Sequence, residues 1–332
     1  AREAQDQFPE LVRRLLFETP EAGQISIRTG DGVGLAGKDG VAIFERQTKL
    51  LPAGEIWFEF GTNKDPRRKA TGDYNGRKAE ASQDVTFVFM TPRRWQGKDA
   101  WVDERRAERL FKDVFVLDAD DLEAWLLLAP AAHLWISEML GLQPQSAVTL
   151  ETWWDSFSAA AEPALPLNLF VAGRAKEAQL LQTLLTSEPR VISIQTEWTE
   201  DALGFLQACL TQMDSKLSAL NVVTIVRSTD VWGRIVDFPG RGILVPDFDN
   251  ADVARATASG RYVVSIVDSE SAARRSVDIL LPRVGRNEAA ESFRADDIDW
   301  RQADRLAVLA RRSMPALARK LSRSPRVRSE ER

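Results

Sequence analysis

The sequence has very little of the chemistry that most metal and disulfide sites use. Cys209 is its only cysteine and His133 its only histidine. A single cysteine excludes an intramolecular disulfide, and one residue of each kind excludes a Cys/His metal cluster, so any metal site must be built from carboxylates. The chain also lacks an apolar run of the roughly 20 residues that a membrane span requires, and its start lacks the layout of a signal peptide. We therefore expect a cytoplasmic protein that makes no contact with the membrane.

Neither sign of charge dominates the composition. The 332 residues include 44 lysines and arginines and 49 aspartates and glutamates, which gives a formal net charge of −5. This balance excludes a uniformly basic nucleic-acid coat, but it is compatible with a local basic groove. The length and the 44% hydrophobic content suit two globular domains, each with its own core. Because the sequence begins at Ala1, we also consider it a piece of a longer protein.

The first part of the chain is predicted to be a helix followed by a mixed sheet. Apolar residues at helical spacing surround Pro9, which suits a first turn. Short apolar runs predict strands, and the stretches between and after them predict a crossover helix at 103–112 and a helical region at 121–140. The strands are expected at 25–28, 41–44, 56–60, 85–90 and 114–117. We assign residues 1–150 to this domain.

A change of composition separates this part from the rest. Residues 156–166, "SFSAAAEPALP", are mostly small residues and prolines, which indicates a linker that we place at 151–168. Beyond it strands and helices alternate, as is typical of a parallel three-layer α/β sheet. The strands are expected at 191–195, 222–226, 242–245, 262–267 and 277–281. We assign 169–290 to this second domain and 291–332 to a helical, lid-like segment that ends in a frayed tail.

Two carboxylates stand beside or within apolar strands of the first domain. Asp39 follows the glycine-rich bend "GDGVGLAGKDG", and Glu59 lies inside "IWFEF". A buried carboxylate is costly to ionise unless a cation compensates it. Two neighbouring strands would hold both side chains on one face, which suits Mg²⁺ or Mn²⁺, and Glu10 on the first helix is expected as a further outer ligand. Such an ion can activate a water and stabilise the charge that develops on a phosphodiester.

A basic, partly aromatic segment follows Glu59. A nuclease needs positive side chains to position the phosphates, and a lysine to orient the attacking water or to stabilise the transition state. The residues expected to bind nucleic acid are Lys64, Arg67, Arg68, Tyr74, Arg77, Arg93 and Arg94. The alternative interpretation is that the acids are solvated or paired with arginine, and that the basic residues belong to exposed loops.

The order of these features resembles that of the PD-(D/E)XK restriction-endonuclease-like superfamily. More closely, "GKDG", "WFEFGTNKDPRRKATGDYNGR" and "TFVFMTPRRW" resemble the N-terminal nuclease-like domain of large bacterial phage-defence proteins, in which a STAND-type NTPase region follows. The resemblance covers residues 8–140 and implies Asp39 and Glu59 as metal ligands and Lys69 as the catalytic lysine. The sequence departs from the pattern at two positions. Gly61 stands where the superfamily places its lysine, so that role passes to Lys69 or Lys64, and Lys38 stands where the closer relatives have an aromatic residue.

The second domain resembles the entry to a STAND or AAA+-type NTPase in the stretch "LFVAGRAKEAQLLQTLLTSEPRVISIQTEWTEDALGFLQACL". A working phosphate loop needs glycines, so that backbone N–H groups can cradle phosphates, and then a lysine. Here "QTEWTED" follows the strand, without glycine or lysine, and its three acids would repel a triphosphate. We therefore expect no NTP hydrolysis. Asp247 and Asp249 lie where a Walker B segment would be, but we expect them to cap the following helix.

The sequence thus predicts an α/β protein: a restriction-endonuclease-like mixed sheet with flanking helices, then a parallel three-layer domain of the P-loop-NTPase type without a phosphate loop, and a C-terminal helical lid. The predicted function is metal-dependent DNA cleavage in bacterial defence against phage or foreign DNA. The expected partners are DNA and further domains or subunits of a defence complex, and self-association is left open. The alternatives are a catalytically inactive sensor or assembly module that binds nucleic acid or protein and, ranked last, an NTP-driven switch.

Overall fold

The chain forms two compact units. The computed structural model describes residues 2–30, 37–142, 145–213, 223–268, 276–296 and 298–322. Most of the glycine-rich bend before Asp39 and the predicted frayed tail lie outside these residues. The units divide between Ile136 and Ser137, so the boundary that we predicted at residue 150 falls inside the second unit.

The sheet of the first unit has five strands in the order β1-β2-β3-β4-β5. The first three form an antiparallel meander, and β4 and β5 run parallel to β3. All the strands expected from the apolar runs are present, with ends shifted by a few residues. They are β1 (Ala22–Ile27), β2 (Gly40–Phe44), β3 (Gly54–Phe60), β4 (Val85–Met90) and β5 (Asp113–Leu117).

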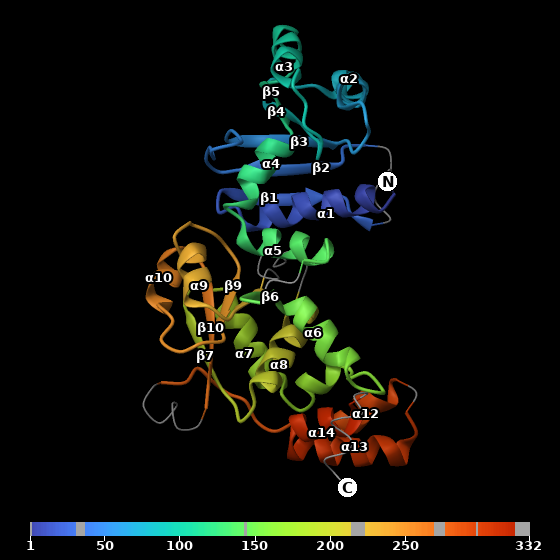
Figure 1. Cartoon of the computed structure of the whole chain (residues 1–332), viewed down its shortest axis with the longest axis vertical. Helices are drawn as coiled ribbons and strands as arrows, with labels where there is room; N and C mark the ends of the chain where they lie inside the picture. Colours follow the sequence, from blue (N-terminus) through green and yellow to red (C-terminus); the bar gives the residue numbers. More distant parts are fainter. Residues whose placement is uncertain are drawn as a thin grey trace. The chain divides into compact units, whose positions relative to one another are not determined.

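Helices cover both faces of this sheet (Figure 1). One face packs on α1 (Arg2–Glu18), α4 (Ala119–Leu126) and α5 (Pro130–Met139), and the other on α2 (Pro66–Arg77) and α3 (Lys98–Ala107). Along β3, Phe58 points into the first core and Trp57 into the second. Because side chains alternate along a strand, Glu59 projects to the side of α2 and α3.

The predicted crossover helix is displaced from the range 103–112. It begins at Lys98 and ends at Ala107, and Arg109 then adopts a positive φ of 53°. An L-residue in this left-handed conformation cannot continue a right-handed helix, so the chain turns there toward β5.

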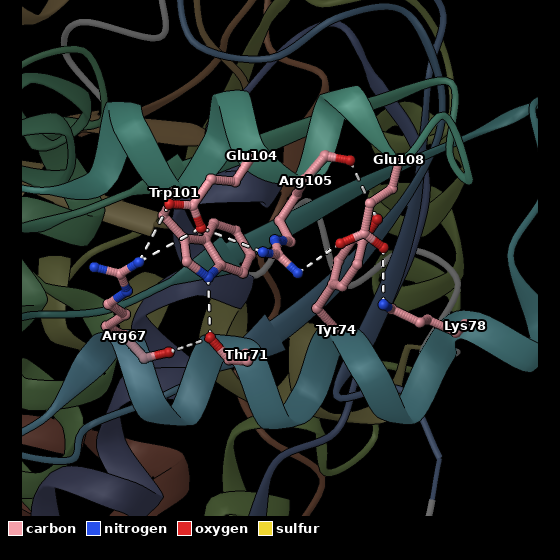
Figure 2. Close-up of polar contacts among 8 residues, drawn as sticks. All are labelled: Arg67, Thr71, Tyr74, Lys78, Trp101, Glu104, Arg105 and Glu108. Carbon is pink, nitrogen blue, oxygen red and sulfur yellow. Dashed lines mark hydrogen bonds and ion pairs between the residues drawn. The ribbon is translucent and has the colours of Figure 1, made fainter.

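Helix α2 was not predicted, because its sequence "PRRKATGDYNGR" contains two glycines and few apolar residues. It starts at a favourable cap, since the Asp65 side chain accepts the N–H of Arg68 at 3.0 Å and Pro66 occupies the first turn. Polar contacts then join it to α3, as Figure 2 shows. Trp101 Nε1 donates to Thr71 Oγ1 at 3.0 Å, and Lys78 pairs with Glu108 at 2.8 Å.

One side of α2 packs against α3, and the opposite side faces the sheet. Thr71, Tyr74 and Lys78 make contacts on the α3 side (Figure 2). Positions 69, 73 and 77 follow one another at intervals of four, which places them on the opposite side of the same helix. This side carries Lys69, Asp73 and Arg77 toward the sheet.

The second unit contains a six-stranded sheet in the order β11-β7-β10-β9-β8-β6. Five strands are parallel, and β6 pairs with β8 in the antiparallel sense at one edge. If the five parallel strands are numbered 1 to 5 in the order in which they occur in the sequence, their order across the sheet is 5-1-4-3-2. The strands are β6 (Ala147–Thr149), β7 (Val191–Gln195), β8 (Val223–Val226), β9 (Ile243–Pro246), β10 (Tyr262–Val267) and β11 (Ile279–Leu280).

Helices also cover both faces of the second sheet. One face packs on α6 (Leu150–Ala159), α7 (Ala175–Leu185) and α8 (Thr199–Gln212), and the other on α9 (Thr229–Val236) and α10 (Val253–Ala258). The expected C-terminal helical segment is present as α12 (Arg286–Arg294), α13 (Trp300–Arg312) and α14 (Met314–Leu321), which pack together and against the 3-10 segment Leu167–Val171 (Figure 1).

The first half of the predicted linker at 151–168 is helix. It holds α6, whose Trp153 packs with the core of the sheet and whose Trp154 and Phe157 contact Phe170. Ser156, Ser158 and Ala159 therefore belong to an amphipathic helix, whose aromatic residues make it part of the packed second unit.

Candidate functional site

The structure places Asp39 and Glu59 opposite each other on neighbouring strands. The antiparallel register pairs Gly40 with Phe58, so the next pair beyond the end of β2 is Asp39 with Glu59. Directly opposed residues project to the same face, with Cβ atoms about 5 Å apart. Asp39 Oδ2 also accepts the backbone N–H of Phe60 at 2.8 Å, which fixes the aspartate against β3.

The carboxyl group of Glu59 is buried, with 3% of the residue exposed. Burial, together with the negative charges of Asp39 and Asp73, raises the pKa of Glu59 to about 7 against the opposing effect of the Arg77 hydrogen bond and charge. An added cation beside these carboxylates would favour the ionised form. The site therefore combines a buried acid with a local excess of negative groups.

Arg77 is the partner of Glu59. Its Nε donates to Glu59 Oε1 at 2.5 Å, and its Nη2 donates to the backbone carbonyl of Gly37. The side chain of Arg77 is only 17% exposed. We expected Arg77 to bind nucleic acid, but in the structure its guanidinium points inward because the buried Glu59 carboxylate needs a cation.

The stem of Lys69 packs against Gly61, two residues after Glu59. A Cβ atom at Gly61 would lie 2.9 Å from Lys69 Cγ and 2.5 Å from Phe89 Cζ. Only glycine therefore leaves room for the Lys69 stem. The ammonium group of Lys69 donates to Asp73 Oδ1 at 2.6 Å.

Asp73 is a member of the site that the sequence reasoning missed. Its Oδ2 atom is buried without a hydrogen-bond partner among the described residues. Burial raises the pKa of Asp73, and the charge of Asp39 raises it further, against the hydrogen bond and charge of Lys69. The spacing of four that joins Asp73 to Lys69 and Arg77 would have revealed it, had the segment been assigned to a helix.

The oxygen donors present fit a divalent cation held by two carboxylates. Among the described residues, no three histidine, cysteine, aspartate or glutamate side chains lie close enough together to hold a metal ion. Mg²⁺ is commonly bound through one or two carboxylates, with water and substrate phosphates completing its shell, so Asp39 and Glu59 suffice.

Glu10 is not brought to this pair. It forms ion pairs with Arg13 and Arg14 of its own helix, at 2.5 and 2.8 Å.

Most of the predicted phosphate-binding residues are exposed on loops and at the start of α2. The side chains of Lys64 and Arg68 are exposed and make no hydrogen bond or ion pair among the described residues. Arg93 donates to the carbonyl of Thr62 at 3.4 Å, which joins the loop after β4 to the loop after β3. Because β3 and β4 are parallel, both loops leave the same edge of the sheet. Arg67 and Arg94 are exposed and pair with Glu104 at 3.3 Å and with Asp120 at 2.8 Å.

The structure corrects the prediction for Tyr74. Its side chain is fully buried and packs edge-to-face on Phe87 and Trp101, and its hydroxyl donates to the carbonyl of Arg105 at 3.3 Å. A buried ring has no face to offer to a base. Tyr74 therefore anchors α2 in the core instead of stacking on nucleic acid.

The raised pKa of Glu59 predicts a pH-dependent stability. A carboxyl group with a pKa near 7 in the folded state and near 4.5 when unfolded holds its proton more tightly in the folded protein, so its contribution falls as pH rises through this interval. We expect Glu59→Gln to gain about 3 kcal/mol relative to the wild type between pH 4.5 and pH 8. Urea unfolding of both proteins at several pH values measures this. Parallel curves would contradict the assignment.

The second unit has neither a glycine nor a lysine between the end of β7 and the first turn of α8. Asp201, in that first turn, is instead bound by Arg174, whose Nη1 and Nη2 donate to the two carboxylate oxygens at 2.7 and 2.6 Å. Arg174 is 1% exposed and also donates to the carbonyls of Phe170 and Pro282. A buried ion pair thus occupies the start of the helix.

A cavity of about 130 Å³ lies beside this ion pair, between the end of β7 and the junction of α13 with α14. Arg283, Arg311 and Arg312 contribute to its wall.

Farther along the sheet, Asp247 pairs with Arg227 at 3.2 Å. The cap of α10 is Asp252, whose side chain accepts the N–H of Arg255 at 3.0 Å, so the expectation that Asp247 or Asp249 caps this helix is wrong.

In the part of the chain that the structure describes, no helix is both long and apolar enough to cross a membrane. No family model and no curated protein sequence matches the chain.

Proposed function

We propose that the first unit is a metal-dependent DNA endonuclease of the PD-(D/E)XK type. The observation that carries this proposal is the pair of carboxylates, Asp39 and Glu59, opposed across β2 and β3 with Lys69 entering over Gly61. The meander followed by parallel strands, with helices on both faces, agrees with the fold that the sequence resemblance implies.

Each group of residues has a role in this proposal. Asp39 and Glu59 would hold Mg²⁺ or Mn²⁺, which supplies an activated water and stabilises the negative charge on the phosphate. Lys69, whose ammonium group pairs with Asp73, would assist by orienting the water or by donating to the developing charge. The exposed cations on the loops after β3 and β4 and at the start of α2 hold the DNA backbone. They are Lys64, Arg67, Arg68, Arg93 and Arg94.

For the second unit we propose an NTPase-like domain that does not hydrolyse nucleotide. The order of its parallel strands and the helical group that follows them support this architecture. Its β7–α8 segment offers no glycine loop and no lysine, and a buried Arg174–Asp201 pair stands at the helix start. Such a unit suits recognition or assembly in a larger defence protein.

The test is cleavage of plasmid DNA by the purified chain in Mg²⁺, in Mn²⁺ and in EDTA. We expect nicked or linear products with either ion and intact plasmid with the chelator, because two carboxylates alone cannot activate water on a phosphodiester. Cleavage that persists in EDTA would exclude the proposed chemistry. A heat-denatured sample controls for contaminating metal-independent activity.

The second candidate is a catalytically inactive sensor or assembly module. The ion pair between Arg77 and Glu59 favours it, because an arginine already satisfies the buried carboxylate. Gly61 at the usual lysine position favours it as well. DNA binding in a gel-shift assay, without cleavage in either metal, would select this candidate over the nuclease.

A further inference from the structure

The guanidinium of Arg77 contacts three acceptors from three parts of the first unit. Nε donates to Glu59 of β3, Nη2 donates to the carbonyl of Gly37, and Nη1 lies 3.4 Å from Glu80 Oε1 in the short 3-10 turn Lys78–Glu80. The contact with Glu59 is the shortest ion pair of Arg77, at 2.5 Å, and the contact with Glu80 is the longest. Arg77 thus sits between a buried carboxylate and an exposed one.

The two carboxylates differ in how strongly each needs a cation. The side chain of Glu59 is 4% exposed and that of Glu80 is 50% exposed. Glu80 is also paired with Lys38, at 3.1 Å, so water and a second cation already serve it. A buried carboxylate without a cation is strongly destabilised, whereas an exposed pair contributes little. In the protein without metal, the preferred ion-pair partner of Arg77 is therefore Glu59.

A divalent cation on Asp39 and Glu59 would compete with Arg77 for the same carboxylate. The charge of the ion would satisfy Glu59 and repel the guanidinium, and hard cations prefer these oxygens. Glu80 lies already within reach of Nη1, so Arg77 has a second acceptor at a short distance. The exchange needs a change of side-chain partner and no movement of α2.

We propose that Arg77 is a built-in counter-ion of the cation site. It holds Glu59 in the metal-free protein, and it transfers to Glu80 when a divalent cation binds Asp39 and Glu59. This inference rests on the proposed nuclease function, since the cation site is the same. Its consequence is that the ion pair lowers the metal affinity, so that the site fills at a higher concentration of the ion than it would without Arg77.

The experiment is a calorimetric titration of the full chain with Mn²⁺, without DNA. We expect Arg77→Gln to bind Mn²⁺ on the order of ten-fold more tightly than the wild type, because no arginine must leave Glu59. Glu80→Gln is expected to bind it several-fold more weakly, because the displaced arginine loses its second acceptor. Arg106→Gln is the matched control, since Arg106 belongs to α3, pairs with Asp113 of β5 at 2.5 Å, has no role in the proposed site, and should leave the affinity unchanged.

The outcomes separate this inference from the proposed function. If the wild type and Arg77→Gln bound Mn²⁺ with equal affinity while Glu59→Gln did not bind it, the proposed role of Arg77 would be rejected. The proposed cation site on Asp39 and Glu59 would stand. Absence of binding in all variants, or binding that survives Glu59→Gln, would remove the cation site itself. Unfolding in EDTA checks that each variant is folded. Glu80→Gln keeps the Arg77–Glu59 pair, so it tests the inference even if Arg77→Gln does not fold.

Discussion

Glu59→Gln is expected to lower DNA cleavage on the order of a thousand-fold. The substitution keeps the size of the side chain and one acceptor oxygen, but it removes the negative charge opposite Asp39. The remaining carboxylate would hold a divalent cation weakly, so both the activated water and the stabilisation of the phosphate are lost. Single-turnover cleavage of plasmid DNA at saturating Mg²⁺ measures the effect.

A matched control distinguishes the loss of charge at this site from loss of charge in general. Glu104→Gln changes an exposed glutamate of α3 that pairs with Arg67 on the other side of α2, and it should cleave at the wild-type rate. Asp39→Asn should behave like Glu59→Gln. If Glu59→Gln retained full cleavage, the carboxylate pair would not be the active site, and the sensor interpretation would take its place.

Asp201→Ala is expected to destabilise the second unit by about 3 to 5 kcal/mol. The partner, Arg174, is 1% exposed, and both of its terminal nitrogens donate to the Asp201 carboxylate. Removal of this carboxylate leaves a buried guanidinium whose charge has no counter-ion, although the carbonyls of Phe170 and Pro282 still accept from it. Urea unfolding followed by circular dichroism gives the change in the free energy of unfolding.

An exposed ion pair next to the same segment provides the comparison. Glu197 pairs with Arg283 at 3.2 Å, and both side chains are more than half exposed. Glu197→Ala should therefore change the free energy of unfolding by less than about 1 kcal/mol. Equal effects of the two substitutions would show that the burial of Arg174 carries no energetic weight and that Asp201 does not anchor the start of α8.

The strands and their order along the chain follow from local sequence patterns. In β3 an apolar run of β-branched and aromatic residues has no competing helical pattern, and the same holds for β4 and β7. The two acids also stood out, because Asp39 and Glu59 interrupt or border such runs. Their pairing needs only that two consecutive strands form an antiparallel pair, which short connections favour.

Helix α2 shows what local patterns could not provide. Gly72 and Gly76 disfavour a helix, and the sequence has no continuous apolar stripe. The helix exists because Tyr74 fills a core with aromatic residues of β4 and α3, and because polar groups of α3 meet those of α2. These partners are distant in sequence. The residues near Tyr74 and Arg77 along the chain therefore do not show that both side chains point inward, and the prediction that they bind nucleic acid could not be corrected from the sequence.

The strands and the opposition of Asp39 and Glu59 were predictable from the sequence, because each depends on residue type and on near neighbours along the chain. The cations that serve those carboxylates were not, because they come from a helix whose position depends on distant segments. Glu59 takes its charge partner from Arg77, and Lys69 enters through the space left at Gly61, since α2 is docked by α3 with one side toward the sheet. Burial and packing between distant segments set these contacts, and both arise only when the chain is folded.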